Sequence, residues 1–93
     1  MKAHELLADP KHWTKRAYAR DKDGQSVSAH SDEAVCWCVL GAIIKCYGYL
    51  ECPESRIVRT GLIEKYKHGM ITNFNDIEAS HEQVVSLLKE LDV

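Results

Sequence analysis

Residues 34–44 constrain the fold more than any other part of the chain, because they are apolar almost throughout. A helix with apolar side chains around most of its circumference is buried at the centre of a protein. Ser31 before this stretch is suited to an N-cap, and Gly48 after it to a C-terminal stop. Gly41 costs a helix about 1 kcal/mol relative to alanine, which indicates that another segment crosses close to it. We therefore expect a central buried helix over about residues 32–47.

Three other segments have the pattern of helices that pack around this one. Residues 2–8 are expected to form a short helix, and Pro53 is expected to begin a longer one over residues 53–67 that Gly69 closes. The buried face of the longer helix is expected from its spacing to hold Ile57, Val58, Leu62, Ile63 and Tyr66. The last helix begins at Ser80 with the spacing of a capping box. Residues 71–77 are expected to be irregular or extended.

A small β-hairpin is predicted over residues 14–29. Residues 21–24 form a strong turn signal with glycine in fourth position, and β-tolerant residues lie on both sides of the turn. An isolated hairpin is marginally stable, so it must pack on the helices. The predicted fold class is therefore α+β and mainly helical, with three or four helices around the central one, in a single domain over residues 1–93.

Composition limits the range of functions and locations. The chain has 93 residues and a formal net charge of −2, which gives no general attraction to nucleic acid. Residues 34–44 would span only about 17 Å as a helix, too short for a bilayer, so no membrane association is expected. The first residues lack the long apolar run of a signal peptide, and we therefore expect a cytoplasmic location. No pattern for a cofactor is present, and none is expected.

The four cysteines are interpreted as reduced thiols packed in the protein. A disulfide framework belongs to exported proteins, and free cysteine behaves as a small apolar residue. In a helix the sulfurs of Cys36 and Cys38 point in nearly opposite directions, so they cannot bind one metal ion. The histidines also lack the helical spacing of a metal site, and no metal is expected. If one thiol is functional, Cys38 is the candidate.

Asn75 and Asp76 are the most function-like polar pair. Such residues commonly accept hydrogen bonds from nearby backbone amides in turns and caps, which is the favoured interpretation. The alternative places Asp76 in a cleft with Arg20 or Cys38. A small thiol-dependent enzyme would then use Cys38 as nucleophile with His81, Asn75 and Asp76 as supporting groups.

A basic stretch with interleaved aromatic residues runs along the predicted hairpin. A solvated face is the first interpretation of this stretch, and a surface for an acidic partner is the second. Stacking of single-stranded nucleic acid on its aromatic rings is a third. The candidate binding residues are Trp13, Lys15, Arg16, Tyr18 and Arg20. The C-terminal stretch is acidic, so the two ends of the chain could pair within one subunit or across a homodimer.

Several short motifs follow one another in a recognisable order: Trp13-Thr14, Ala17-Tyr18-Ala19-Arg20-Asp21, Gly24, Cys36-Trp37-Cys38, Gly41-Ala42 and Phe74-Asn75-Asp76. Taken in this order, they resemble one family of small bacterial and phage-borne proteins that is catalogued only as a domain of unknown function. The chain departs from the family pattern at Lys15-Arg16, where glutamine and glycine are expected, and at Phe74, where tryptophan is usual. The resemblance implies a shared fold and a bacterial or phage origin, and it implies no activity.

The leading functional prediction is a non-catalytic domain that binds an unknown protein partner, as an adaptor would. It rests on the small size, the lack of a catalytic, nucleotide or metal signature, and the charge asymmetry between hairpin and C-terminus. The thiol-dependent enzyme and the nucleic-acid-binding hairpin remain alternatives.

Overall fold

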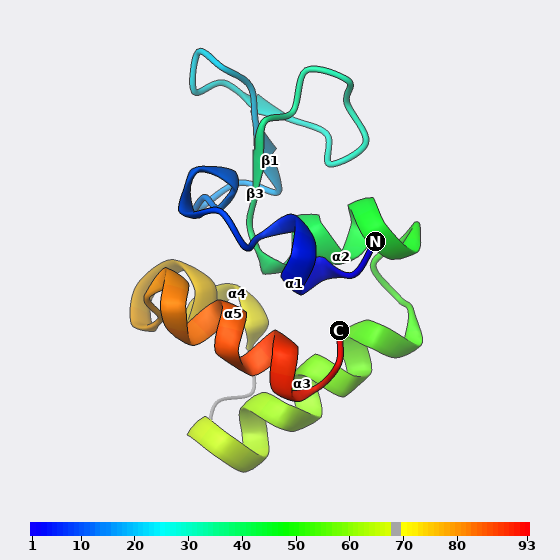
Figure 1. Cartoon of the computed structure of the whole chain (residues 1–93), viewed down its shortest axis with the longest axis vertical. Helices are drawn as coiled ribbons and strands as arrows, with labels where there is room; N and C mark the ends of the chain where they lie inside the picture. Colours follow the sequence, from blue (N-terminus) through cyan, green and yellow to red (C-terminus); the bar gives the residue numbers. More distant parts are fainter. Residues whose placement is uncertain (68–69) are drawn as a thin grey trace.

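The computed structural model describes residues 1–67 and 70–93, which form a mainly helical α+β fold with a small antiparallel sheet at one end (Figure 1). The molecule measures 36 × 24 × 19 Å. The sheet lies at one end of the long axis, α1 (Ala3–Leu6) and α2 (Val39–Tyr47) lie in the middle, and α3 (Pro53–Tyr66) lies at the opposite end. The predicted fold class is confirmed.

The predicted hairpin is confirmed, and the sheet has a third strand. β1 (Ala19–Arg20) pairs antiparallel with β2 (Ser26–Val27) on one side and β3 (Cys36–Trp37) on the other. The hairpin turn places Gly24 at φ 82°, the left-handed conformation that glycine adopts without steric cost. A short 3-10 turn, η1 (Pro10–His12), leads into this part of the chain.

The predicted central helix is wrong in its first part. The side chain of Ser31 accepts from the Glu33 amide in a local turn and does not cap a helix. β3 then runs extended because β1 offers a strand partner, a long-range pairing that the local apolar pattern does not reveal. Helix α2 begins only after the N-cap Cys38, so Cys36 and Cys38 are not on a helix together.

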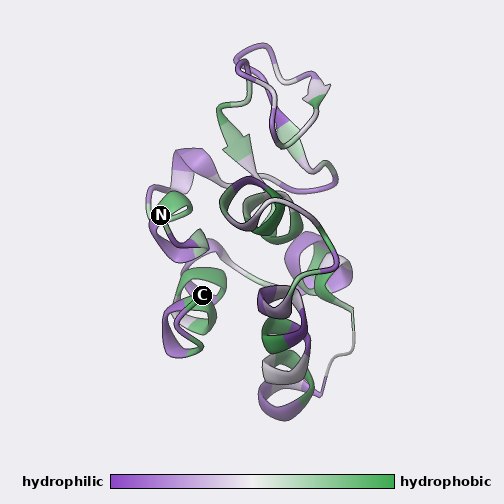
Figure 2. Ribbon diagram, turned by 90° about the vertical axis from the view of Figure 1, so that its right-hand side faces the viewer, coloured by the Kyte–Doolittle hydropathy of each residue, from purple (hydrophilic) through white to green (hydrophobic). Residues whose placement is uncertain are grey.

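The remainder of the predicted helix is α2, and it is the buried centre that the apolar stretch predicts: Figure 2 shows most of its ribbon in the green of hydrophobic residues. Gly41 lies against the backbone of Tyr18, the residue before β1, so a Cβ atom at Gly41 would lie 1.8 Å from the Tyr18 carbonyl oxygen. Gly48 ends the helix at φ 100°. The close crossing at Gly41 and the stop at Gly48 are therefore both confirmed.

The other helices surround α2. Helix α3 starts at the predicted Pro53, while its predicted end signal, Gly69, lies outside the described residues. Its buried positions include Val58 and Leu62, but Ile57 and Ile63 are exposed. The prediction was wrong for these two isoleucines because the side of α3 that packs against the rest of the protein includes only some of the helix's apolar residues.

The segment expected to be irregular is helical. It forms the single-turn α4 (Ile71–Asn73) followed by a π-helix, η2 (Phe74–Glu78). A π-helical turn is frequent at functional sites. Helix α5 (His81–Glu90) follows and begins with the predicted capping box between Ser80 and Gln83.

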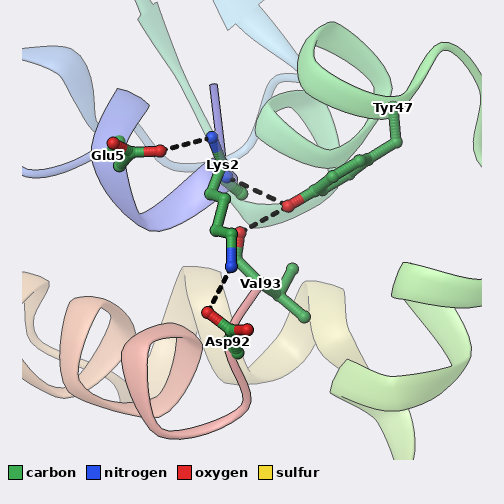
Figure 3. Close-up of polar contacts among 6 residues, drawn as sticks. Lys2, Glu5, Tyr47, Asp92 and Val93 are labelled. Atoms are coloured by element: carbon green, nitrogen blue, oxygen red, sulfur yellow. Dashed lines mark hydrogen bonds and ion pairs between the residues drawn. The ribbon is translucent and has the colours of Figure 1, made fainter.

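The two ends of the described chain meet beside Tyr47 (Figure 3). The Val93 carbonyl oxygen accepts from the Ala3 amide at 2.7 Å and from the Tyr47 hydroxyl at 2.5 Å. An exposed ion pair between Lys2 and Asp92 lies next to these bonds. These contacts hold α1 and the end of α5 against α2.

Candidate functional site

A cleft of about 310 Å³ opens between the sheet, the start of α2 and the π-helical turn η2. Five segments contribute to it: the loop before β1, the edge strand β2, α2, and the consecutive turns α4 and η2. Its walls combine apolar side chains with a few polar and charged groups. The lining residues are Arg16, Ala17, Tyr18, Ser26, Cys38, Leu40, Ile71, Thr72, Asn75 and Asp76.

Asn75 is buried on the wall of the cleft, with 1% of its surface exposed. Its Oδ1 accepts from Trp13 Nε1 at 2.7 Å and from the Val39 amide at 3.0 Å. Its Nδ2 donates to the Thr14 carbonyl at 3.1 Å and to Asp76 Oδ1 at 2.8 Å. The amide side chain therefore uses its hydrogen-bonding capacity within the protein, and it caps the first amide of α2.

Asp76 fixes the backbone of the loop before β1. Its Oδ1 accepts from the Arg16 amide at 2.9 Å as well as from Asn75. Arg16 has φ 65°, in the left-handed region. Glycine is the residue that this conformation favours, and the family resemblance leads one to expect glycine at the same position. Arg16 therefore occupies a strained position, and strain of this kind tends to occur at functional sites.

Cys38 lies on the inner wall of the cleft, with 7% of its surface exposed. Its Sγ accepts from the Gly41 amide at 3.3 Å, in the first turn of α2. Burial raises the pKa of this thiol, the negative charge of Asp76 adds to the increase, and hydrogen bonds from backbone amides oppose it. Since the thiolate is the reactive form, this environment disfavours a nucleophile.

The alternative catalytic set is brought together only in part. Cys38, Asn75 and Asp76 line one cleft, as the cleft interpretation of the sequence requires. His81 is not among the lining residues, and its Nε2 lies 2.6 Å from the carbonyl oxygen of Leu7. The centroid of its ring lies 5.9 Å from that of the Trp13 ring. In this arrangement His81 does not contact the Cys38 thiol, so it is not placed to act as its base.

The candidate binding residues also divide into two groups. Arg16 and Tyr18 line the cleft, and Tyr18 is 49% exposed. Trp13 and Arg20 have structural contacts instead: the first bonds Asn75, and the second donates to the carbonyls of Gly24 and Lys15. The Lys15 ammonium lies 5.2 Å from the centre of the Trp13 ring.

Five lining residues were missed by sequence reasoning: Ala17, Ser26, Leu40, Ile71 and Thr72. They come from the loop before β1, a strand edge, a helix and a helical turn, which meet only through long-range contacts. No local signal marks them in the sequence. The one pointer that the sequence offers nearby is the Lys15-Arg16 departure from the family pattern.

Three further properties concern the described part of the chain. Within residues 1–67 and 70–93, no group of three or more histidine, cysteine, aspartate or glutamate side chains is placed to hold a metal ion. All four cysteines are free thiols, in agreement with the prediction. None of the helices described is both long enough and apolar enough to cross a membrane.

Comparison with known proteins places the chain in a family. Residues 1–91 match the model of a family described as "Family of unknown function (DUF6197)". No curated protein and no solved structure matches the chain.

Proposed function

The chain belongs to DUF6197, a family of unknown function, and from the geometry of its cleft we propose that it is a non-catalytic domain that binds a segment of a partner protein. The observation that carries this proposal is the position of Arg16. Its guanidinium takes part in no ion pair or hydrogen bond with residues 1–67 and 70–93, and Arg16 lines a cleft whose walls are partly apolar. The Asp76 side chain holds its backbone in a strained conformation there.

The chemistry of the cleft suggests the kind of segment that it holds. Guanidinium groups bind carboxylates through paired hydrogen bonds, and Tyr18, Leu40 and Ile71 offer apolar surface beside Arg16. An exposed tyrosine next to an arginine is typical of the residues that dominate protein interfaces. The proposed occupant is therefore an extended segment with an acidic side chain close to an apolar one.

A peptide selection tests this proposal directly. Random linear peptides displayed on phage are selected on the immobilised protein, and the enriched sequences are synthesised and titrated in solution. We expect a consensus with Asp or Glu near an apolar residue. Arg16→Glu should weaken binding of the consensus peptide by about tenfold or more, since hydrogen bonds to charged groups contribute more than neutral ones.

Lys22→Glu is the matched control, because it makes the same charge change in the exposed hairpin turn, outside the cleft. It should change peptide affinity by no more than about twofold. Enriched peptides without carboxylates, or equal effects of the two variants, would contradict the proposal. So would strong binding of a fluorescent oligothymidylate that falls steeply with salt while no peptide is enriched, because that result indicates a nucleic-acid site.

The thiol-dependent enzyme is less well supported by the same cleft. Cys38 has a raised pKa, and His81 is bonded elsewhere. Alkylation of the folded protein by iodoacetamide, followed by mass spectrometry, separates the two functions. We expect the half-buried Cys36 to react before the buried Cys38. Preferential labelling of Cys38 at neutral pH would favour the enzyme.

We place this binding event in the cytoplasm of a bacterium, in a protein of bacterial or phage origin. The support for this placement is the resemblance of its motifs to those of bacterial and phage-borne proteins. Four free thiols accord with a reducing compartment.

A further inference from the structure

Helix α3 exposes a second surface, on the end of the molecule opposite the sheet (Figure 1). Five exposed residues of α3 fall within about 120° of the helix circumference, since each residue turns the helix by about 100°. Two of them are isoleucines, Ile57 at 43% and Ile63 at 50% exposure. We call this surface the α3 face, and it consists of Arg56, Ile57, Thr60, Ile63 and Glu64.

A groove runs along one edge of the α3 face. It has a volume of about 310 Å³ and lies between α3 and the end of α5. Gly61 has no side chain, so the Leu91 side chain packs directly against the backbone of α3 at the floor of the groove, where a Cβ atom at Gly61 would lie 2.6 Å from it. The groove gives the α3 face an apolar depression beside its isoleucines.

The sequence of the α3 face is symmetric about Thr60 in a way that fits a second copy of this chain. Ile57 and Ile63 lie three residues to either side of Thr60, and Arg56 and Glu64 lie four residues to either side. When two α3 helices cross antiparallel at Thr60, Arg56 of each copy comes opposite Glu64 of the other. The isoleucines then cover one another on both sides of the crossing point.

The two charged groups are available for this pairing. Within residues 1–67 and 70–93 neither Arg56 nor Glu64 takes part in an ion pair or a hydrogen bond of its side chain. We propose that the α3 face binds the α3 face of a second copy, with two Arg56–Glu64 ion pairs around an apolar centre. This inference goes beyond the proposed function, because none of the five residues lines the cleft.

The size of the surface sets the strength of the association. Helix α3 has 14 residues and is therefore about 21 Å long. Two crossed helices of this length bury less than the roughly 1,200 Å² of a standard stable interface. The dimer is therefore weak and reversible, and it forms at high protein concentration.

Sedimentation equilibrium over a series of protein concentrations, at low salt, tests the dimer. Arg56→Glu and Glu64→Arg should each raise the dissociation constant by about tenfold, since each replaces two attractions by two repulsions. The double variant Arg56→Glu/Glu64→Arg should restore dimerisation to near the original value. A restored double variant cannot be explained by a folding defect in the single ones.

Arg59→Glu is the matched control, since it reverses an exposed arginine of α3 outside the α3 face. Circular dichroism checks that each variant is folded. A protein that stays monomeric at every concentration overturns the inference, and so does an equal effect of Arg56→Glu and Arg59→Glu or a double variant without recovery. Arg16→Glu should leave the dimer unchanged, so the outcome is independent of the cleft.

Discussion

The indole Nε1 of Trp13 donates a hydrogen bond of 2.7 Å to Oδ1 of Asn75, and this bond joins two segments that are 62 residues apart. The same oxygen accepts from the Val39 amide, and the amide nitrogen of the side chain holds Thr14 and Asp76. One buried side chain therefore connects the loop before the sheet, the start of α2 and the π-helical turn. These are the segments that form the cleft.

Asn75→Ala should reduce the free energy of unfolding by about 2–4 kcal/mol, because it leaves buried donors of Trp13 and Val39 without an acceptor. Asn75→Asp keeps the acceptors but puts a second carboxylate beside Asp76, so its stability should improve as the pH is lowered. Urea denaturation measures both variants. Asn73→Ala, at an exposed position of the preceding turn, is the control and should change stability by less than about 0.5 kcal/mol. If Asn75→Ala behaves like Asn73→Ala, the side chain is not the connection that its bonds suggest.

Arg16→Gly should separate stability from function. Glycine adopts the φ of 65° at this position without steric cost, so the variant should be more stable by about 1 kcal/mol. It also removes the guanidinium at the cleft, so affinity for the selected peptide should fall. Thermal or urea unfolding and peptide titration of the same preparation check the two effects. A less stable variant would show that the Arg16 side chain makes packing contacts worth more than the backbone strain.

The prediction of the fold from sequence failed where a distant partner decided the structure. Residues 34–37 continue the apolar pattern of α2, yet Cys36 and Trp37 are extended because Arg20 and Ala19 of β1 pair with them. Local signals succeeded where the deciding atoms are close in sequence. The Ser80 capping box and the stop at Gly48 are examples.

The candidate site shows the same division. Cys38, Asn75 and Asp76 were selected for their chemistry, and the structure places them in one cleft. Their contacts could not be read from the sequence, since three of the four partners of Asn75 lie 36 to 62 residues away. The strain at Arg16 was visible in the sequence only as an arginine where the family resemblance leads one to expect glycine.

Gly41→Ala should be far more damaging than Gly24→Ala. At Gly41 a Cβ atom would lie 1.8 Å from the Tyr18 carbonyl oxygen, so β1 and α2 would have to separate, at a cost of about 3 kcal/mol or more. At Gly24 the space is open, and only the positive φ opposes alanine, at about 1 kcal/mol. Urea denaturation of both variants gives the comparison. Similar losses would mean that the sheet moves away from α2 easily.

The buried Cys38 thiol should make the protein less stable in alkaline solution. Burial raises its pKa in the folded state above the ordinary value of 9.0, so the unfolded thiol ionises first. The stability that the protonated Cys38 thiol gives the folded state is therefore complete below about pH 9. It is lost as the pH rises through the pKa of this thiol in the folded protein. Cys38→Ser keeps an N-cap acceptor for α2 and removes this ionisation. Unfolding in urea between about pH 7 and pH 10 should show that the free energy of unfolding falls less with pH for Cys38→Ser than for the original protein. The same dependence on pH in both proteins would contradict the prediction.

Tyr47→Phe should loosen the contact between the two ends of the described chain. The hydroxyl donates to the Val93 carbonyl at 2.5 Å, and its removal should cost about 1 kcal/mol. The Ala3 amide keeps its own bond to Val93, so the ends stay paired but less firmly. Hydrogen exchange should therefore accelerate at Ala3 and in the last turn of α5 while the amides of β1 keep their protection. Tyr49→Phe is the control, because Tyr49 is 59% exposed and should have no effect at these amides. Faster exchange throughout the protein would mean that Tyr47 supports the whole core, and unchanged exchange at Ala3 would mean that the hydroxyl contributes nothing to holding the ends together.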